Sequence, residues 1–341
     1  MSTPPPARRT APTLEAVAAA AGVSRSTASR VLNGSSNVSP DAASSVRKAV
    51  TRLNYIPNRA ARSLVNSQTM SIALVVPEDT IRFFGDPYFA AIVRGIAKGL
   101  EDSDYVLNLQ LASPSEPSEK TVRYLSGGNV DGAFVASHHS GDHFLTSLSE
   151  RLPVVFGGRP LGADTTANYY VDVDNTAAAA MGTRYLLDQG RSRVATIAGP
   201  IDMPAGIDRV EGWRAELGRA GLPATRLAHG DFTMTGGARA MRELLDAHPD
   251  LDSVFVASDL MAVGAMSMLR ERGLSVPRDV AVVGFDDSPA AVTGDIQLTT
   301  VHQPSTAMGV TMAETMLALL RGEKPQREHI LPTHMVVRDS A

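Results

Sequence analysis

The sequence predicts an α/β protein in which a head of three short helices precedes a body made of two doubly wound lobes. Two observations predict this fold class. Between residues 13 and 53 apolar residues recur at helical spacing, whereas beyond about residue 70 short apolar runs alternate with amphipathic stretches. Alternation of strands and helices is typical of parallel sheets that are covered by helices on both faces.

Length and composition limit the class of protein. The 341 residues are 43% hydrophobic and include no cysteine, which predicts about two packed domains and excludes disulfides, thiolate metal sites and a cysteine nucleophile. No apolar run approaches the roughly 18 residues of a membrane span. The start, MSTPPPARRTAPT, lacks the apolar core of a secretory signal. We therefore expect a cytoplasmic protein without a membrane partner.

The net charge of −4 is distributed unevenly along the chain. Residues 1–69 hold nine basic and two acidic side chains, a balance of +7, whereas the remainder holds 23 basic and 34 acidic ones, a balance of −11. A basic head on an acidic body indicates a module that binds a polyanion, joined to a part with another task.

The head is predicted as a disordered tail over residues 1–12, followed by three helices. In the first helix Leu14, Val17, Ala18 and Ala21 share a face, and Gly22 ends it in the left-handed conformation. The second helix is capped by Ser24 and ends at Asn33-Gly34, and the third is capped by Ser39 with Pro40 at its first position. Three short helices joined by tight turns form a helix-turn-helix.

The body is predicted to contain more strands than one sheet can hold, and hence two lobes. The apolar runs that predict strands are 71–77, 105–111, 130–136, 153–157, 193–199, 253–257 and 280–285. The amphipathic stretches that predict helices include 89–100, 176–189, 210–220 and 236–247.

The stretch TLEAVAAAAGVSRSTASRVLNG is the strongest functional signal. Its second helix carries polar side chains on the outer face, among them Arg25, Ser26, Ser29 and Arg30, as a helix that enters the major groove requires. An arginine fork can bind guanine or phosphate. The alternative is a helical hairpin that only packs against the body; the charge of +7 favours DNA.

Together with NYIPNRAARSLV, this stretch resembles the LacI/GalR family of bacterial transcription regulators. The resemblance covers nearly the whole chain and implies a periplasmic-binding-protein-like (type I) body. It implies a helix-turn-helix domain over 13–57, a hinge helix and linker over 58–70, and a body over 71–341. The first lobe would span about 71–170 and 301–330, and the second about 171–300 and 331–341. The partners would be double-stranded operator DNA, a second copy of the chain, with a tetramer left open, and a small-molecule effector.

In the family, the segment matching 58–65 is a hinge helix that folds only on operator DNA, and the leucine matching Leu64 wedges into the minor groove. An eight-residue helix is too short to be stable alone, and an apolar wedge kinks DNA. The alternative is an ordinary linker whose Leu64 packs on the body. The resemblance implies DNA contacts at Thr13, Leu14, Ser24, Arg25, Ser26, Thr27, Ser29, Arg30, Asn33, Tyr55, Asn58, Arg62 and Leu64.

The resemblance also implies an effector cleft between the lobes, at the carboxyl ends of strands. The matching residues are Asp86, Tyr88, Phe89, Arg209, Phe232, Asp259 and Asp286, and we also expect His138, in a polar loop at a strand end, to touch the ligand. Many family members have an aspartate near the position of Gly157, and this chain differs from them there. We expect Arg159 to bind the polar groups of the effector in place of that aspartate. Arginine, aspartate and aromatic rings suit a sugar. The alternatives are that Asp259 caps a helix that begins at Leu260 and that Arg209 pairs with Glu211.

The sequence predicts no metal, cofactor or catalytic residue. SHHSGDH holds His138, His139, Asp142 and His143, but Gly141 favours a polar loop over a metal site. The patterns G-x-G-x-x-G after a strand, G-x-x-x-x-G-K, G-x-S-x-G and H-E-x-x-H are absent. The predicted function is a dimeric, sugar-released repressor of carbohydrate-utilisation genes. The alternatives are a corepressor-type regulator with a non-sugar effector, a sugar-binding transport protein, and a sugar-acting enzyme with a DNA-binding head.

Overall fold

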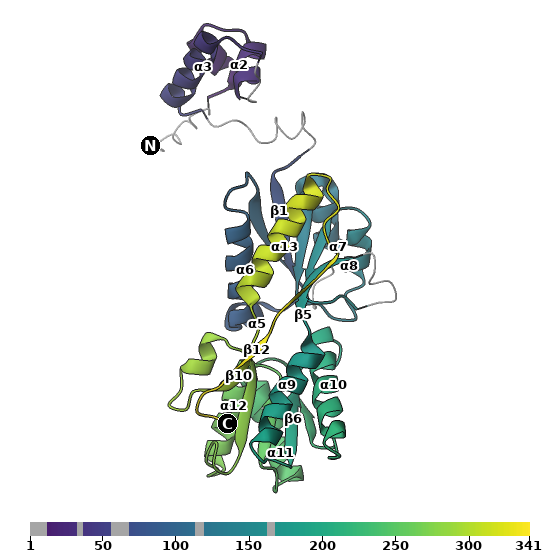
Figure 1. Ribbon diagram of the computed structural model, residues 1–341. Coiled ribbons are helices and arrows are strands. Elements are labelled where there is room, and N and C mark those ends of the chain that lie inside the picture. The colour runs from purple at the N-terminus through teal and green to yellow at the C-terminus, as the bar shows by residue number, and fades with distance from the viewer. Residues whose placement is uncertain (1–11, 33–36, 56–67, 113–118, 162–167) are drawn as a thin grey trace, which may run out of the picture. The chain divides into compact units, whose positions relative to one another are not determined.

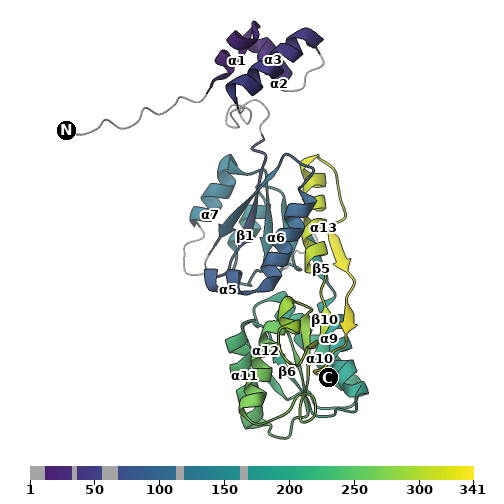
Figure 2. The ribbon, with the colours of Figure 1, turned by 90° about the vertical axis from the view of Figure 1, so that its left-hand side faces the viewer.

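The computed structural model describes residues 12–32, 37–55, 68–112, 119–161 and 168–341. The chain forms two compact units, residues 1–69 and 70–341. Figures 1 and 2 show that the first unit is helical and that the second consists of sheets flanked by helices. The α/β class and the two parallel-sheet lobes that the sequence predicts are confirmed.

The first unit contains α1 (Leu14–Ala21), α2 (Arg25–Leu32) and α3 (Pro40–Leu53). Gly22 ends α1 with φ 67°, and the hydroxyl oxygen of Ser24 accepts the backbone N–H of Thr27 at 3.1 Å. Its core consists of Val17, Ala18, Ala28, Val46 and Ala49. The Gly22, Ser24 and Ser39 caps and the apolar faces therefore lie where the sequence places them, whereas the predicted helix end at Asn33-Gly34 lies outside the described residues.

The first lobe of the body is a six-stranded parallel sheet. Its spatial order is β11 (Glu328–Leu331), β5 (Tyr169–Val173), β4 (Val154–Gly157), β3 (Gly132–Ala136), β1 (Ser71–Val76) and β2 (Val106–Leu111). Its helices are α5 (Thr80–Gly85), α6 (Pro87–Gly99), α7 (Glu119–Tyr124), α8 (Phe144–Ser149) and α13 (Ser305–Leu320), and a π-helical turn spans Leu125–Asn129.

The second lobe has the same plan with one reversed edge strand. Its order is β12 (His334–Val336), β10 (Thr299–His302), β9 (Ala281–Asp286), β8 (Ser253–Val256), β6 (Val194–Ala198) and β7 (Leu227–His229), and β12 alone among these runs antiparallel. Its helices are α9 (Asn175–Asp188), α10 (Pro204–Arg219), α11 (Met234–Ala247) and α12 (Asp259–Glu271), with a 3₁₀ turn at Pro289–Val292.

The chain passes between the lobes three times. The crossings lie between β5 and α9, between β10 and α13, and between β11 and β12. Consequently α13, although late in the sequence, packs against α6 of the first lobe, as Figure 2 shows. The two helices approach so closely at Gly95 that a Cβ atom there would lie 2.1 Å from a carbonyl oxygen of α13.

Candidate functional site

The outer face of α2 in the head carries polar and basic side chains. Arg25, Ser26 and Arg30 are exposed, Ser29 is half-buried, and Ala28 is fully buried against the other helices. Arg25 Nε lies 2.9 Å from Glu15 Oε1, with both side chains largely exposed. An exposed ion pair contributes at most about 1 kcal/mol, so a phosphate or guanine can readily replace Glu15 as the partner of Arg25.

The other predicted DNA contacts fall into three groups. Thr13 and Ser24 cap helices through their oxygens, and Thr27 bonds to Ser24. Leu14 and Tyr55 are half-buried and pack against the core of the head, so most of their surface serves its stability. Asn33, Asn58, Arg62 and Leu64 lie outside the described residues.

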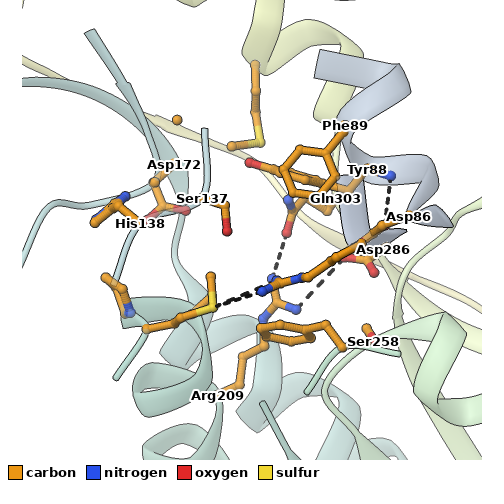
Figure 3. A pocket seen from close by; sticks show the side chains of 18 residues that line it. Asp86, Tyr88, Phe89, Ser137, His138, Asp172, Arg209, Ser258, Asp286 and Gln303 are labelled. Carbon is orange, nitrogen blue, oxygen red and sulfur yellow. Dashed lines mark hydrogen bonds and ion pairs between the residues drawn. The ribbon is translucent and has the colours of Figure 1, made fainter. Parts of the chain in front are cut away.

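Between the lobes of the body lies a cleft with about 650 Å³ of space, its open mouth included (Figure 3). Seven of the predicted effector residues line it: Asp86, Tyr88, Phe89, His138, Arg209, Phe232 and Asp286. Gly157 and Gly158, which belong to a segment that the sequence places at the cleft, line it too, and sequence reasoning missed the rest of the lining: Arg82, Ser137, Asp172, Met203, Pro204, Ala205, Ser258, Gln303 and Met308.

Arg209 on α10 is the buried cation of the cleft, with 5% of its surface exposed. Its Nε donates to Asn175 Oδ1 at 2.9 Å, Nη1 to the Ala257 carbonyl, and Nη2 to Gln303 Oε1 at 2.8 Å. Its guanidinium carbon lies 3.5 Å from the centroid of the Phe285 ring. The alternative pairing with Glu211 is wrong, because Glu211 pairs with Arg214 at 2.8 Å. The bonds from Arg209 to Asn175, Ala257 and Gln303 fix its guanidinium in one orientation.

Three residues that line the cleft have a backbone conformation with positive φ, which is uncommon for residues other than glycine. Ser137, Phe232 and Asp286 are non-glycine residues with φ of 61°, 62° and 113°. The Phe232 ring occupies the space beside Gly199, where a Cβ atom would lie 2.3 Å from it. Strained backbone of this kind concentrates at ligand sites, which supports a binding role for the cleft.

The carboxyl groups of the cleft are poorly solvated. Burial raises the pKa of Asp86, whose carboxylate also caps α6 by accepting the Tyr88 N–H at 3.0 Å. Burial likewise raises the pKa of Asp172 and raises that of Asp286 well above its ordinary value. These groups bind hydroxyls more readily than they tolerate a second negative charge.

Two of the predicted cleft residues do not line the cleft. The Arg159 guanidinium turns to Asp208, with Nη2 2.9 Å from each carboxylate oxygen, and only its backbone supports the site, by donating to Asp172 Oδ2 at 2.7 Å. Asp259 is fully buried below the floor, where it accepts from Thr300 Oγ1 at 2.6 Å and from the Ser288 N–H at 2.7 Å.

The alternative for Asp259 was also wrong, because α12 begins at Asp259 itself and Ser258 is its cap. Burial raises the pKa of Asp259 to about 7. Through its bonds to Ser288 and Thr300, Asp259 holds the segment just after β9 and the neighbouring strand β10 in place beneath the cleft.

Polar contacts join the lobes at the mouth of the cleft. Glu78 and His139 belong to the first lobe and Asp202 to the second. The His139 ring places Nε2 3.1 Å from Glu78 Oε1 and Nδ1 2.9 Å from Asp202 Oδ2. Because the Glu78 hydrogen bond outweighs partial burial, the pKa of His139 is raised. The His139–Asp202 contact and the Arg159–Asp208 pair thus link the two lobes.

His139 and Asp142, the sequence's weak metal candidates, thus take part in hydrogen bonds within the loop and across the lobes. Within the described residues, no group of three or more His, Asp or Glu side chains is arranged to hold a metal ion. No helix in the described ranges has the length and apolar character needed to cross a membrane.

A basic helix-turn-helix head joined to two α/β lobes with a polar cleft defines a DNA-binding transcription regulator controlled by a small molecule. Residues 13–58 match the model of the bacterial regulatory proteins of the lacI family, and residues 183–341 match that of the periplasmic binding protein-like domain. The chain belongs to the lacI family.

Relatives that match nearly the whole chain are also transcription regulators. The HTH-type transcriptional regulator CelR of Thermobifida fusca is 44% identical over 337 residues, covering 98% of this chain and 99% of the relative. The ribose operon repressor of Escherichia coli K12 is 30% identical over 331 residues, covering 95% and 98%. The match of the head decides against the transport alternative, which has no such head.

Solved structures show the same architecture. A CelR–cellobiose complex has a TM-score of 0.77 at 42% identity, covering 97% of this chain and all of the other. The lac repressor dimer bound to operator and the anti-inducer ONPF has a TM-score of 0.85 at 27% identity, covering 97% and 99%. The predicted family, fold and regulatory function are confirmed.

Proposed function

We propose that this regulator is a homodimeric repressor that leaves its operator when a neutral β-linked disaccharide of the cellobiose type binds between the lobes. The observation that carries the proposal is the cleft, which combines one fixed guanidinium with carboxyl groups and aromatic rings. Carboxylates and guanidinium groups bind hydroxyls, while rings cover the apolar faces of a pyranose. A relative with 44% identity over nearly the whole chain has been solved with cellobiose.

Coupling of the two sites follows from linkage. A sugar that binds one arrangement of the lobes more tightly shifts the chain toward it, and operator and sugar then weaken each other by the same factor. In this proposal Arg25, Ser26, Ser29 and Arg30 read bases. The dimer would bind a palindromic operator in the cytoplasm, one half-site for each subunit. The Leu64 side chains of the two subunits would insert into the minor groove at the centre of the operator.

The test uses the full-length protein and a labelled fragment of its own promoter. Fluorescence anisotropy is measured while cellobiose, maltose, lactose, ribose or glucose is added. Release by cellobiose at lower concentration than by the other sugars supports the proposal. Tighter DNA binding on addition of sugar would make the effector a corepressor, and no response to any sugar would refute the sugar effector.

A further inference from the structure

His138, which follows β3, forms part of the wall of the cleft and is 95% removed from solvent. Figure 3 shows it beside Ser137 and Asp172, away from the guanidinium of Arg209. Its ring meets Phe156 edge to face, with 5.6 Å between the ring centres. The ring is therefore held in one position by packing as well as by polar contacts.

The hydrogen bond of His138 determines which of its ring nitrogens carries the proton. Nε2 lies 3.1 Å from the Arg159 carbonyl oxygen, which can only accept. Nε2 must therefore be the protonated nitrogen. Burial lowers the pKa of His138 to about 4, so the ring is neutral near pH 7 and Nδ1 carries a lone pair.

Nδ1 has no hydrogen-bond partner among the described residues, although it is buried. A buried acceptor without a donor is costly, and because His138 lines the cleft, a molecule bound there is a source of such a donor. The neighbouring Asp172 cannot do so as a carboxylate, because its oxygens accept from Arg159, Val173 and Asn175. The guanidinium of Arg159 is held by Asp208.

Two glycines adjoin His138 at this wall of the cleft. A Cβ atom at Gly157 would lie 3.1 Å from the Met312 sulfur, so a larger residue there would crowd the buried Met312 side chain. Gly158 adjoins the ring, since a Cβ atom on it would be 3.8 Å from His138 Cε1. The two glycines leave this part of the wall to the imidazole.

We propose that His138 determines effector specificity by accepting, through Nδ1, a hydrogen bond from one hydroxyl of the sugar. The inference rests on the proposed sugar effector. An oxygen that can only accept, as in a phosphate or carboxylate, does not fit this position. His138 therefore requires an unmodified hydroxyl donor at one position of the effector.

The test compares His138→Gln with His138→Asn in the full-length protein, by calorimetry with cellobiose. A glutamine amide can reach the Arg159 carbonyl as Nε2 does but places no acceptor at Nδ1, whereas asparagine places its amide oxygen near Nδ1. We expect the Kd for cellobiose to rise about 5- to 150-fold in the glutamine variant, the cost of leaving one buried hydroxyl donor without an acceptor, and less in the asparagine variant.

Monodeoxy and monodeoxyfluoro derivatives of cellobiose complete a double-mutant cycle. One deoxy derivative should bind the native protein more weakly by a similar factor but bind His138→Gln as well as cellobiose does. Its fluoro counterpart, which can only accept, should bind as poorly as the deoxy sugar.

Equal affinity of native protein and glutamine variant for cellobiose, a deoxy loss of the same size in both, or recovery by fluorine would overturn the role of His138. Absence of any sugar binding by the native protein would instead refute the proposed function, and the inference with it.

Discussion

Replacement of Arg209 by methionine is expected to remove most of the effector affinity. A guanidinium has five N–H donors, and within the described part of the chain Asn175, Ala257 and Gln303 accept from three of them. Asp286 Oδ1 is 3.8 Å from Nη1, too far for a direct hydrogen bond. One N–H on Nη1 and one on Nη2 therefore remain for a ligand.

The magnitude follows from these two donors. A hydrogen bond that involves a charged group contributes about 1.5–3 kcal/mol, so the loss of two predicts a rise in Kd of at least about 100-fold. Calorimetry with cellobiose measures it, and urea unfolding shows whether the variant is folded. The Arg209→Lys variant keeps the positive charge but loses the paired N–H groups of the guanidinium, so its Kd should lie between those of the native protein and the methionine variant. A folded Arg209→Met protein that binds within about 5-fold of native affinity would refute the reasoning.

Four further predictions concern packing, pH, base reading and salt. Gly95→Ala should lower the free energy of unfolding in urea by about 1–3 kcal/mol or more, because its Cβ atom would meet a backbone carbonyl, whereas Gly85→Ala, with open space around it, should change it by less than about 0.5 kcal/mol. Similar values for both would contradict the close approach of α6 and α13. Of the two carboxylates that raise the pKa of His139, Glu78 lies in the same lobe and Asp202 in the other, so the Asp202 contribution links protonation of His139 to the contact between the lobes. This contribution is fully present below the ordinary pKa near 6.5 and is lost as the pH rises through the raised value. Effector affinity should therefore fall by a few-fold above neutral pH, and this dependence on pH should be weaker in the Asp202→Asn variant. The same pH dependence in the variant and the native protein would argue against a role for the His139–Asp202 contact. Arg30→Ala should weaken operator binding by about 1–3 kcal/mol with less effect on unrelated DNA, measured by anisotropy on both; equal losses on both would restrict Arg30 to phosphate contact. Operator affinity should fall steeply with salt in the same assay, and a flat dependence would contradict a DNA-binding role for the basic head.

Local patterns were enough to predict the head and the strand ends. Caps such as Ser24 and a left-handed glycine such as Gly22 depend on a few neighbouring residues, so their chemistry can be read along the chain. The same holds for Asp86, which caps α6 and lines the cleft.

The rest of the cleft depends on contacts between distant segments. Arg159 follows a strand as predicted, but Asp208 of the other lobe binds its guanidinium. Asp172 lies in a strand that no apolar run revealed, because its sequence YYVDV includes polar and aromatic residues. Gln303 reaches the cleft through the bond to Arg209, 94 positions away. Sequence periodicity contains no information on such pairings.

The three crossings between the lobes have a consequence for the order in which the protein is made. The first sheet lacks β11 and the second lacks β12 until residues 328–336 have been synthesised, and Ser340, fully buried, bonds to Val282 and Thr299 of the second lobe. The helices of the head contact one another and lie near the start of the chain. Since domains fold in order of synthesis, we expect a nascent chain to carry a finished DNA-reading head well before it can respond to a sugar.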